Sequence, residues 1–160
     1  TEKNLYKSIN PNYSFIAFAT HAVRGMNNFF LERGLVLTPL SPEDQDADGF
    51  LSSSEIKSLN LSYNSTVVLT ACNTLEQKYY LSSPFSGLPE SFMAAGASGV
   101  LFSMWNVNTN SSSLINQEIF SAKNNKRAFI DSYRSSILKV KSKENFAHPY
   151  FWASYAYLGK

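Results

Sequence analysis

Apolar and polar positions alternate along the chain in blocks that predict short strands separated by helices. Four apolar runs lack a helical period and are too short for helices, so they indicate strands. These runs cover residues 14–20, 34–38, 66–70 and 99–105. The run at 66–70 is the richest in β-branched residues, which is typical of a strand buried on both faces of a parallel sheet.

Helical segments are expected between and after these strands. They cover residues 53–59, 87–95, 111–122 and 126–140. Ser53 or Ser54 would cap the first of them, and Gly96 would follow the second at a position that favours glycine. In the last segment, apolar residues recur at spacings typical of one helix face. This stripe consists of Phe129, Tyr133, Ile137 and Val140.

The remaining segments read as connections, apart from one more strand. Residues 1–12 are polar and are expected to lead in from elsewhere. Loops or turns are expected at 41–49, 73–86 and 106–110, and a last strand over 150–158, entered through Pro149. Strands alternating with helices predict an α/β domain with a mainly parallel sheet flanked by helices.

The composition favours a folded domain and excludes several functions. Aromatic residues make up 14% of the 160 residues and charged residues only 16%, against a usual charged share of about 25%. With a net charge of +2 and scattered basic residues, nucleic-acid binding is not expected. No apolar run is long enough to span a membrane. The single cysteine, Cys72, allows no intramolecular disulfide, which fits a reducing compartment or a secreted protein without disulfides, and a cytoplasmic location is expected.

Two residues able to do nucleophilic chemistry follow predicted strands. His21 comes directly after the first strand and Cys72 after the strand at 66–70. If these strands are parallel neighbours, both side chains lie at the same edge of the sheet, where ligands bind in such folds. A thiol beside an imidazole base can serve as a nucleophile. A lone cysteine after a strand is more often a small packing residue, and His148, before a proline, is also expected to be structural.

Seven short motifs occur in register from Phe15 onward. They are residues 19–22, 34–38, 48–56, 67–74, 92–97, 103–107 and 148–152. Together they resemble the C-terminal half of the CHAT domain, a family of caspase- and separase-like cysteine peptidases often joined to tetratricopeptide repeats. The resemblance implies a caspase-haemoglobinase-like fold, with residues 1–160 as a single, partial CHAT-type domain. This would be the catalytic part of a longer chain that carries a tetratricopeptide-type or other N-terminal domain.

The same resemblance implies functional roles for particular residues. His21 and Cys72 would form the catalytic dyad of an endopeptidase with a protein substrate and no required cofactor. The backbone N–H groups of Ala22 and Cys72 would hold the oxyanion, although the family commonly has glycine at the first of these positions. Asn106 and Asn108 would lie near the specificity pocket, where many relatives carry Asp at 108. These departures leave a non-catalytic signalling or scaffold domain open as the alternative function.

An acidic segment from residue 44 to residue 55 matches the twelve-position calcium loop of EF-hand proteins. The candidate oxygen ligands are Asp44, Asp46, Asp48, the Phe50 carbonyl and Glu55, with glycine at position six. The entering helix of an EF-hand is not expected, because prolines precede the loop. The alternative is a solvated acidic turn. Calcium is therefore a candidate ligand, with a structural or regulatory role.

Overall fold

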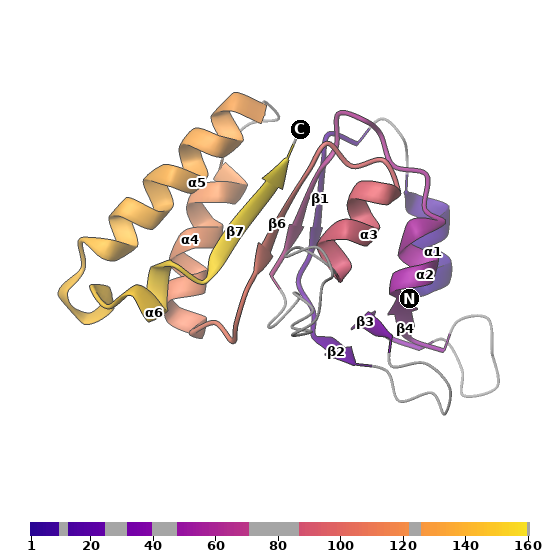
Figure 1. Cartoon of the computed structure of the whole chain (residues 1–160), viewed down its shortest axis with the longest axis horizontal. Helices are drawn as coiled ribbons and strands as arrows, with labels where there is room; N and C mark the ends of the chain where they lie inside the picture. The colour runs from indigo at the N-terminus through magenta and orange to yellow at the C-terminus, as the bar shows by residue number, and fades with distance from the viewer. Residues whose placement is uncertain (10–12, 25–31, 40–47, 71–86, 122–125, 160) are drawn as a thin grey trace, which may run out of the picture.

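The computed structural model describes residues 1–9, 13–24, 32–39, 48–70, 87–121 and 126–159. Its main sheet has four strands in the order β1-β5-β6-β7 (Figure 1). The strands are β1 (Phe15–Phe18), β5 (Thr66–Leu69), β6 (Gly99–Ser103) and β7 (Tyr155–Gly159). The first three run parallel, and β7 pairs antiparallel with β6. The expected α/β fold with a mainly parallel sheet flanked by helices is confirmed.

The two central strands are buried on both faces because each face carries its own hydrophobic core. Val67 and Leu69 of β5 belong to one core, while Val68 between them belongs to the other. In β6, Phe102 and Leu101 divide in the same way. This alternation follows from the two-residue period of a strand and explains why these segments are continuous apolar runs.

Helices cover both faces of the main sheet. On one face lie α4 (Thr109–Ser121) and α5 (Lys126–Lys141), and on the other lie α2 (Ser53–Lys57) and α3 (Leu88–Ala94) (Figure 1). The predicted stripe on α5 packs inward, with Phe129 and Val140 buried in the core beneath it. At the end of α3, Gly96 has φ +112°, and a Cβ there would stand 2.6 Å from the Leu61 carbonyl oxygen. No helix in the described part of the chain is both long and apolar enough to cross a membrane.

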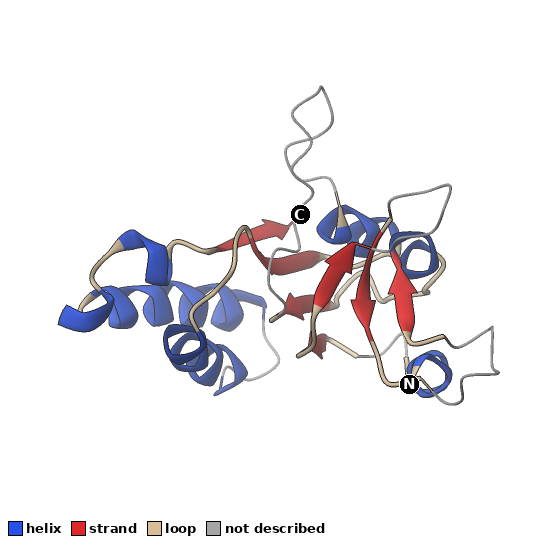
Figure 2. Ribbon diagram, turned by 90° about the horizontal axis from the view of Figure 1, so that it is seen from below, coloured by secondary structure: helices blue, strands red, loops and turns tan. Residues whose placement is uncertain are grey.

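A second, antiparallel sheet of three short strands lies next to the main one. It has the order β2-β3-β4 (Figure 2) and consists of β2 (Ala22–Arg24), β3 (Arg33–Val36) and β4 (Phe50–Ser52). The predicted strand at 34–38 is therefore real but belongs to this sheet. Its neighbours β2 and β4 were not predicted.

The structure adds one helix that was not predicted and corrects two local predictions. The expected lead-in at 1–12 contains a helix, α1 (Glu2–Ser8), because the Thr1 hydroxyl accepts a hydrogen bond from the Asn4 N–H and caps it. Helix α2 is capped by Ser52 rather than by either following serine. The expected strand at 150–158 starts later than predicted, because its first residues belong to a short helix, α6 (Pro149–Trp152), and β7 begins only at Tyr155. A 3-10 turn, η2 (Glu144–Phe146), precedes α6.

Candidate functional site

The carboxyl ends of β1 and β5 form one edge of the main sheet. Phe18 pairs with Leu69 at the last rung of this parallel pair. Beyond it, both the N–H and the hydroxyl of Thr70 donate hydrogen bonds of 3.0 Å to the Phe18 carbonyl. The two strands are therefore held together up to the point where the predicted catalytic residues follow. His21 lies at this edge and is exposed, whereas Cys72 lies outside the described residues.

The backbone on either side of His21 is fixed by the small sheet. The His21 carbonyl accepts a 2.8 Å hydrogen bond from the Val36 N–H, and the Thr20 hydroxyl donates to the Val36 carbonyl. Ala22 is the first residue of β2 and pairs with Leu35. The chain thus changes from the main sheet to the small sheet at His21, which fixes its position at the edge.

A cavity of about 770 Å³ opens beside His21. Its walls come from the residues that follow β1 and β5, from Val107 in the turn between β6 and α4, and from residues along α4. The lining residues are Thr20, His21, Thr70, Val107, Thr109, Ser112, Ser113, Asn116, Gln117, Phe120 and Ser121. Among the lining residues that the structure describes, hydroxyl, amide and apolar groups dominate, and His21 is the single ionisable side chain.

The turn between β6 and α4 holds the two predicted specificity residues. Asn108 Oδ1 accepts hydrogen bonds of 3.1 Å from the N–H groups of both Asn110 and Ser111, so it caps α4. Asn106 is exposed. Neither residue is among those that line the cavity, whereas Val107 between them is. Their role in specificity stays a prediction.

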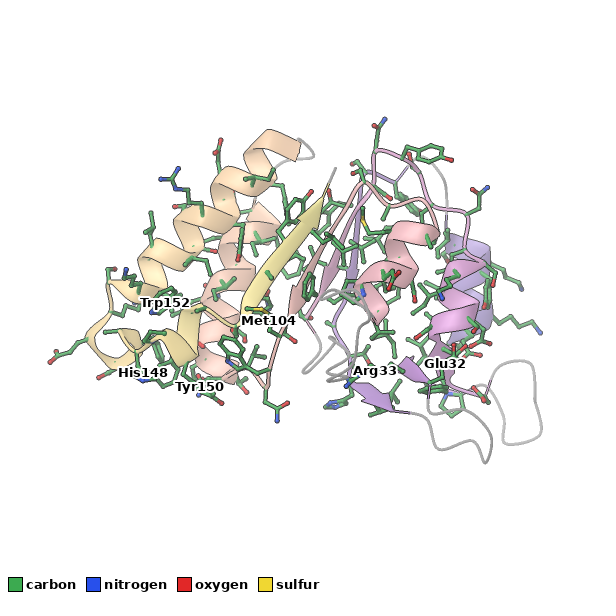
Figure 3. The ribbon with its side chains drawn as sticks, viewed as in Figure 1. Glu32, Arg33, Met104, His148, Tyr150 and Trp152 are labelled. Carbon is green, nitrogen blue, oxygen red and sulfur yellow. The ribbon has the colours of Figure 1, made fainter. Side chains whose placement is uncertain are left out.

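Hydrogen bonds to the segment that contains α6 hold the start of this turn in place. The Met104 N–H donates to the Ser154 carbonyl at 2.8 Å, and Trp105 Nε1 donates to the Tyr150 carbonyl at 3.3 Å. Figure 3 shows Tyr150 and Trp152 together at this end of the helical layer. His148 precedes them and caps α6, because its Nδ1 accepts from the Tyr150 N–H at 3.2 Å. The structural role expected for His148 agrees with this contact.

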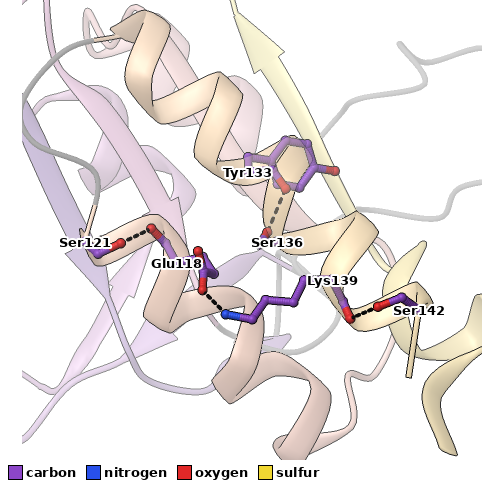
Figure 4. Close-up of polar contacts among 6 residues, drawn as sticks. All are labelled: Glu118, Ser121, Tyr133, Ser136, Lys139 and Ser142. Atoms are coloured by element: carbon purple, nitrogen blue, oxygen red, sulfur yellow. Dashed lines mark hydrogen bonds and ion pairs between the residues drawn. The ribbon is translucent and has the colours of Figure 1, made fainter. Parts of the chain in front are cut away.

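Helix α5 supports α4, the main wall of the cavity, from behind. Lys139 forms an ion pair with Glu118, and serine hydroxyls bond to carbonyls within each helix (Figure 4). This exposed ion pair is worth little on its own. Two further hydrogen bonds link α5 to α4 through β7. The Tyr133 hydroxyl donates to the Tyr155 carbonyl at 2.8 Å, and the Tyr155 hydroxyl donates to the Ser112 hydroxyl at 3.2 Å. Burial raises the pKa of Tyr133.

The acidic segment is described from Asp48 onward, while Asp44 and Asp46 lie outside the described residues. Asp48 Oδ1 accepts a 2.7 Å hydrogen bond from the Phe50 N–H. Glu55 Oε2 accepts at 2.8 Å from the Ser52 N–H in a capping box at the start of α2. Within the described ranges, no three acidic, histidine or cysteine side chains stand close enough to share a metal ion.

One further acidic residue, on α1, has unusual surroundings that the sequence does not reveal. Glu2 of α1 is only 1% exposed, and neither of its carboxylate oxygens has a hydrogen-bond partner of normal geometry in the described structure. Burial raises the pKa of this carboxyl, and the nearby charges of Asp48 and Glu55 raise it further. Because Glu2 lies more than forty positions from the loop in sequence, no local pattern could have connected them.

The fold and the sheet edge define an α/β protein of caspase-like architecture, and comparison with known families agrees. The CHAT domain model matches residues 1–160, so the chain belongs to the CHAT domain family. This family is related to caspase-like cysteine peptidases. A comparison with curated proteins gives no match.

Proposed function

We propose that this chain is a cysteine endopeptidase domain that cleaves a protein substrate through His21 and Cys72. The observation that carries the proposal is the register of the parallel pair β1 and β5. Phe18 pairs with Leu69 at the last rung, and in the sequence His21 and Cys72 each come three positions after the end of β1 and of β5. Phe18 and its partner Leu69 are therefore as far apart in the sequence as His21 and Cys72, so the parallel pairing would bring the proposed dyad to the same level. Family membership adds support, since relatives of this class use the same two residue types.

The register suits the chemistry of a dyad. The Cys72 thiolate would attack the scissile carbonyl carbon, forming an S–C bond and a tetrahedral oxyanion. The backbone N–H groups of Cys72 and Ala22 would stabilise that charge. His21 would then protonate the leaving amine as the C–N bond breaks. Water, deprotonated by His21, would hydrolyse the thioester and release the acid and the thiolate.

Alkylation kinetics test the dyad without a known substrate. Because Cys72 is the only cysteine, all incorporation of iodoacetamide reports on this one thiol. A histidine partner lowers a thiol pKa from its ordinary value of about 8.5. We therefore expect the folded chain to alkylate faster below that pH than the unfolded chain. His21→Gln should slow the reaction about tenfold or more, since the thiolate fraction falls by that factor per pKa unit.

His148→Gln is the matched control, because it removes the other histidine, which caps a helix away from the cavity. It should leave the alkylation rate unchanged. In the longer protein, Cys72→Ala should abolish peptide-bond cleavage while the fold is retained. Equal alkylation rates for the parent and His21→Gln would overturn the dyad and favour the non-catalytic scaffold domain.

A further inference from the structure

The outward side of α5 carries a pattern that the proposed peptidase chemistry does not use. Four of its residues follow one another at spacings of four, four and three positions, which places them on the same side of the helix. They are Ile130, Arg134, Leu138 and Lys141. Apolar and basic residues alternate in this set, and all four side chains are exposed. We call the set the outer row of α5, because this helix forms the outer side of the helical layer (Figure 1).

The apolar members of the outer row are open to solvent. Ile130 is 40% and Leu138 is 56% exposed, whereas Phe129 and Val140 on the inward side of α5 are buried. A single exposed aliphatic residue needs no explanation. Two of them on one side of one helix, with the partly buried Ile137 beside them, form an apolar strip. A partner that covered this strip would remove apolar surface from water, which favours association.

The basic members of the outer row have no acidic partner within the described structure. No ion pair joins Arg134, Lys141 or the neighbouring Lys143 to another described residue, whereas Lys139 pairs with Glu118. Helix α5 and the two residues after it contain six basic side chains and one acidic side chain, although the whole chain has a net charge of only +2. This side of the molecule therefore attracts carboxylates.

The outer row ends next to Trp152 (Figure 3). Lys141 Nζ lies 5.0 Å from the centroid of the Trp152 ring, and Trp152 Nε1 donates to the Ala147 carbonyl at 3.0 Å. The indole is thus held in place while it is only partly buried. Tryptophan and arginine are enriched at the energetic centres of protein–protein interfaces. A nucleic acid would pair with the charges but has no aliphatic side chains to cover Leu138, so these features favour a protein partner.

We propose that the outer row of α5 docks an acidic amphipathic helix of a partner protein. Carboxylates of that helix would lie opposite Arg134 and Lys141. Its aliphatic side chains would cover Ile130 and Leu138. A helix fits the row because it advances about 1.5 Å per residue, as α5 does, whereas an extended segment advances about 3.3 Å and would match fewer positions. None of the described residues that line the cavity beside His21 belongs to α5, so this docking is independent of the proposed peptidase activity.

Binding of a labelled synthetic peptide, measured by fluorescence anisotropy, tests this proposal. The probe is an alanine-rich helix in which glutamate and leucine alternate at the spacings of the outer row, and the reference peptide has the same composition in scrambled order. The patterned peptide should bind about tenfold tighter, because only its order places both residue types against the row. Its binding should weaken when the ionic strength rises from about 0.1 M to about 1 M, which shortens the Debye length from about 10 Å to about 3 Å.

Two variants separate the charged contribution from the apolar one. Arg134→Glu should weaken binding about tenfold or more, because it brings like charges together. Leu138→Ser should weaken binding while its salt dependence stays that of the parent, because only apolar contact is lost. Lys57→Glu is the matched control, since Lys57 is an exposed lysine on α2, on the other face of the main sheet, and should not change the affinity. The variants should melt at the temperature of the parent, so that a loss of affinity reports on docking.

Four results would overturn the proposal. Equal affinity for the patterned and scrambled peptides would show that charge alone attracts the probe. Unchanged affinity in Arg134→Glu would place the binding elsewhere. Tighter binding to vesicles of phosphatidylserine and phosphatidylcholine would identify a lipid surface as the occupant. Self-association of the chain that Leu138→Ser abolishes would identify a second copy instead.

Discussion

At the residue scale, Asn108 has a structural role that its place in the sequence did not predict. The family resemblance implied that Asn108 lies near the specificity pocket, and this role stays a prediction. Its observed contacts are those of a helix cap, with Oδ1 accepting from the N–H groups of Asn110 and Ser111. Asp and Asn cap helices about equally well, so the change between them need not alter specificity.

The cap can be tested by measuring urea unfolding. Asn108→Ala should lower the free energy of unfolding by about 1 kcal/mol, because two backbone N–H groups of α4 lose their acceptor. Asn108→Asp should retain the parent stability, since the carboxylate accepts the same bonds. Asn106→Ala, at the exposed neighbouring position, is the control and should have little effect. Equal losses in the Ala and Asp variants would show that the cap does not explain residue 108.

Glu2 allows a second prediction, on pH dependence in metal-free buffer. Its pKa in the folded state is raised by burial and by Asp48 and Glu55. Above that raised pKa the folded chain carries a buried charge that the unfolded chain exposes to water. Glu2→Gln should therefore be more stable than the parent at neutral pH. As the pH falls through the raised pKa toward the ordinary value of 4.5, the folded parent binds the proton first and the difference should vanish.

Urea unfolding of both chains across this pH range measures the effect. Glu144→Gln, which changes an exposed glutamate, should differ little from the parent at every pH. A stability difference for Glu2→Gln that does not change with pH would contradict the raised pKa.

At the scale of elements, the sequence predicted the strands that are buried on both faces, but it did not predict the shortest strands or the short capped helix α6. The strands β1, β5 and β6 were found because both faces of the sheet require apolar side chains there. Strands β2 and β4 have three residues each, too few for a period to appear. The aromatic run from Tyr150 has the composition of a strand, but Pro149 at a helix start and the His148 cap favour a turn of helix instead.

The candidate site was predictable to a similar extent. The position of His21 at the end of β1 followed from the apolar run before it. The cavity wall on α4 did not, because its small polar residues resemble an ordinary solvated helix face. The surroundings of Glu2 could not be predicted, because Asp48 and Glu55, whose charges act on it, lie in a distant segment of the sequence.

The helix pair α4 and α5 gives a prediction at this scale. Ile119 is fully buried between α4 and the sheet, whereas Leu138 on α5 is 56% exposed. Ile119→Ala should lower the free energy of unfolding by about 2–5 kcal/mol, since it leaves a cavity in the core. Leu138→Ala should change it by no more than about 0.5 kcal/mol. Comparable effects in chemical denaturation would contradict the assignment of the inward face.

At the scale of the whole molecule, the described part of the acidic segment and the cavity occupy different parts of the structure. The described part, from Asp48 to Glu55, runs through β4 into α2, while the cavity lies between the main sheet edge and α4. The small sheet connects them, because β2 starts next to His21 and β4 lies within the acidic segment.

The cavity beside His21 leads to a last prediction, which rests on the proposed peptidase activity. No carboxylate occurs among the described residues that line it. A lysine or arginine side chain entering it would lose water without gaining an opposite charge. If this cavity binds the residue before the scissile bond, peptide-library cleavage by the longer protein should therefore favour uncharged residues at that position.

Asn116 lines the cavity, and its buried Oδ1 has no partner among the described groups. Asn116→Asp should raise kcat/KM for substrates with Lys or Arg there by about tenfold or more, because a desolvated charge pair exceeds 1.4 kcal/mol. Asn145→Asp, exposed on η2, should not change the profile. A parent profile dominated by basic residues would show that this cavity does not bind the residue before the scissile bond.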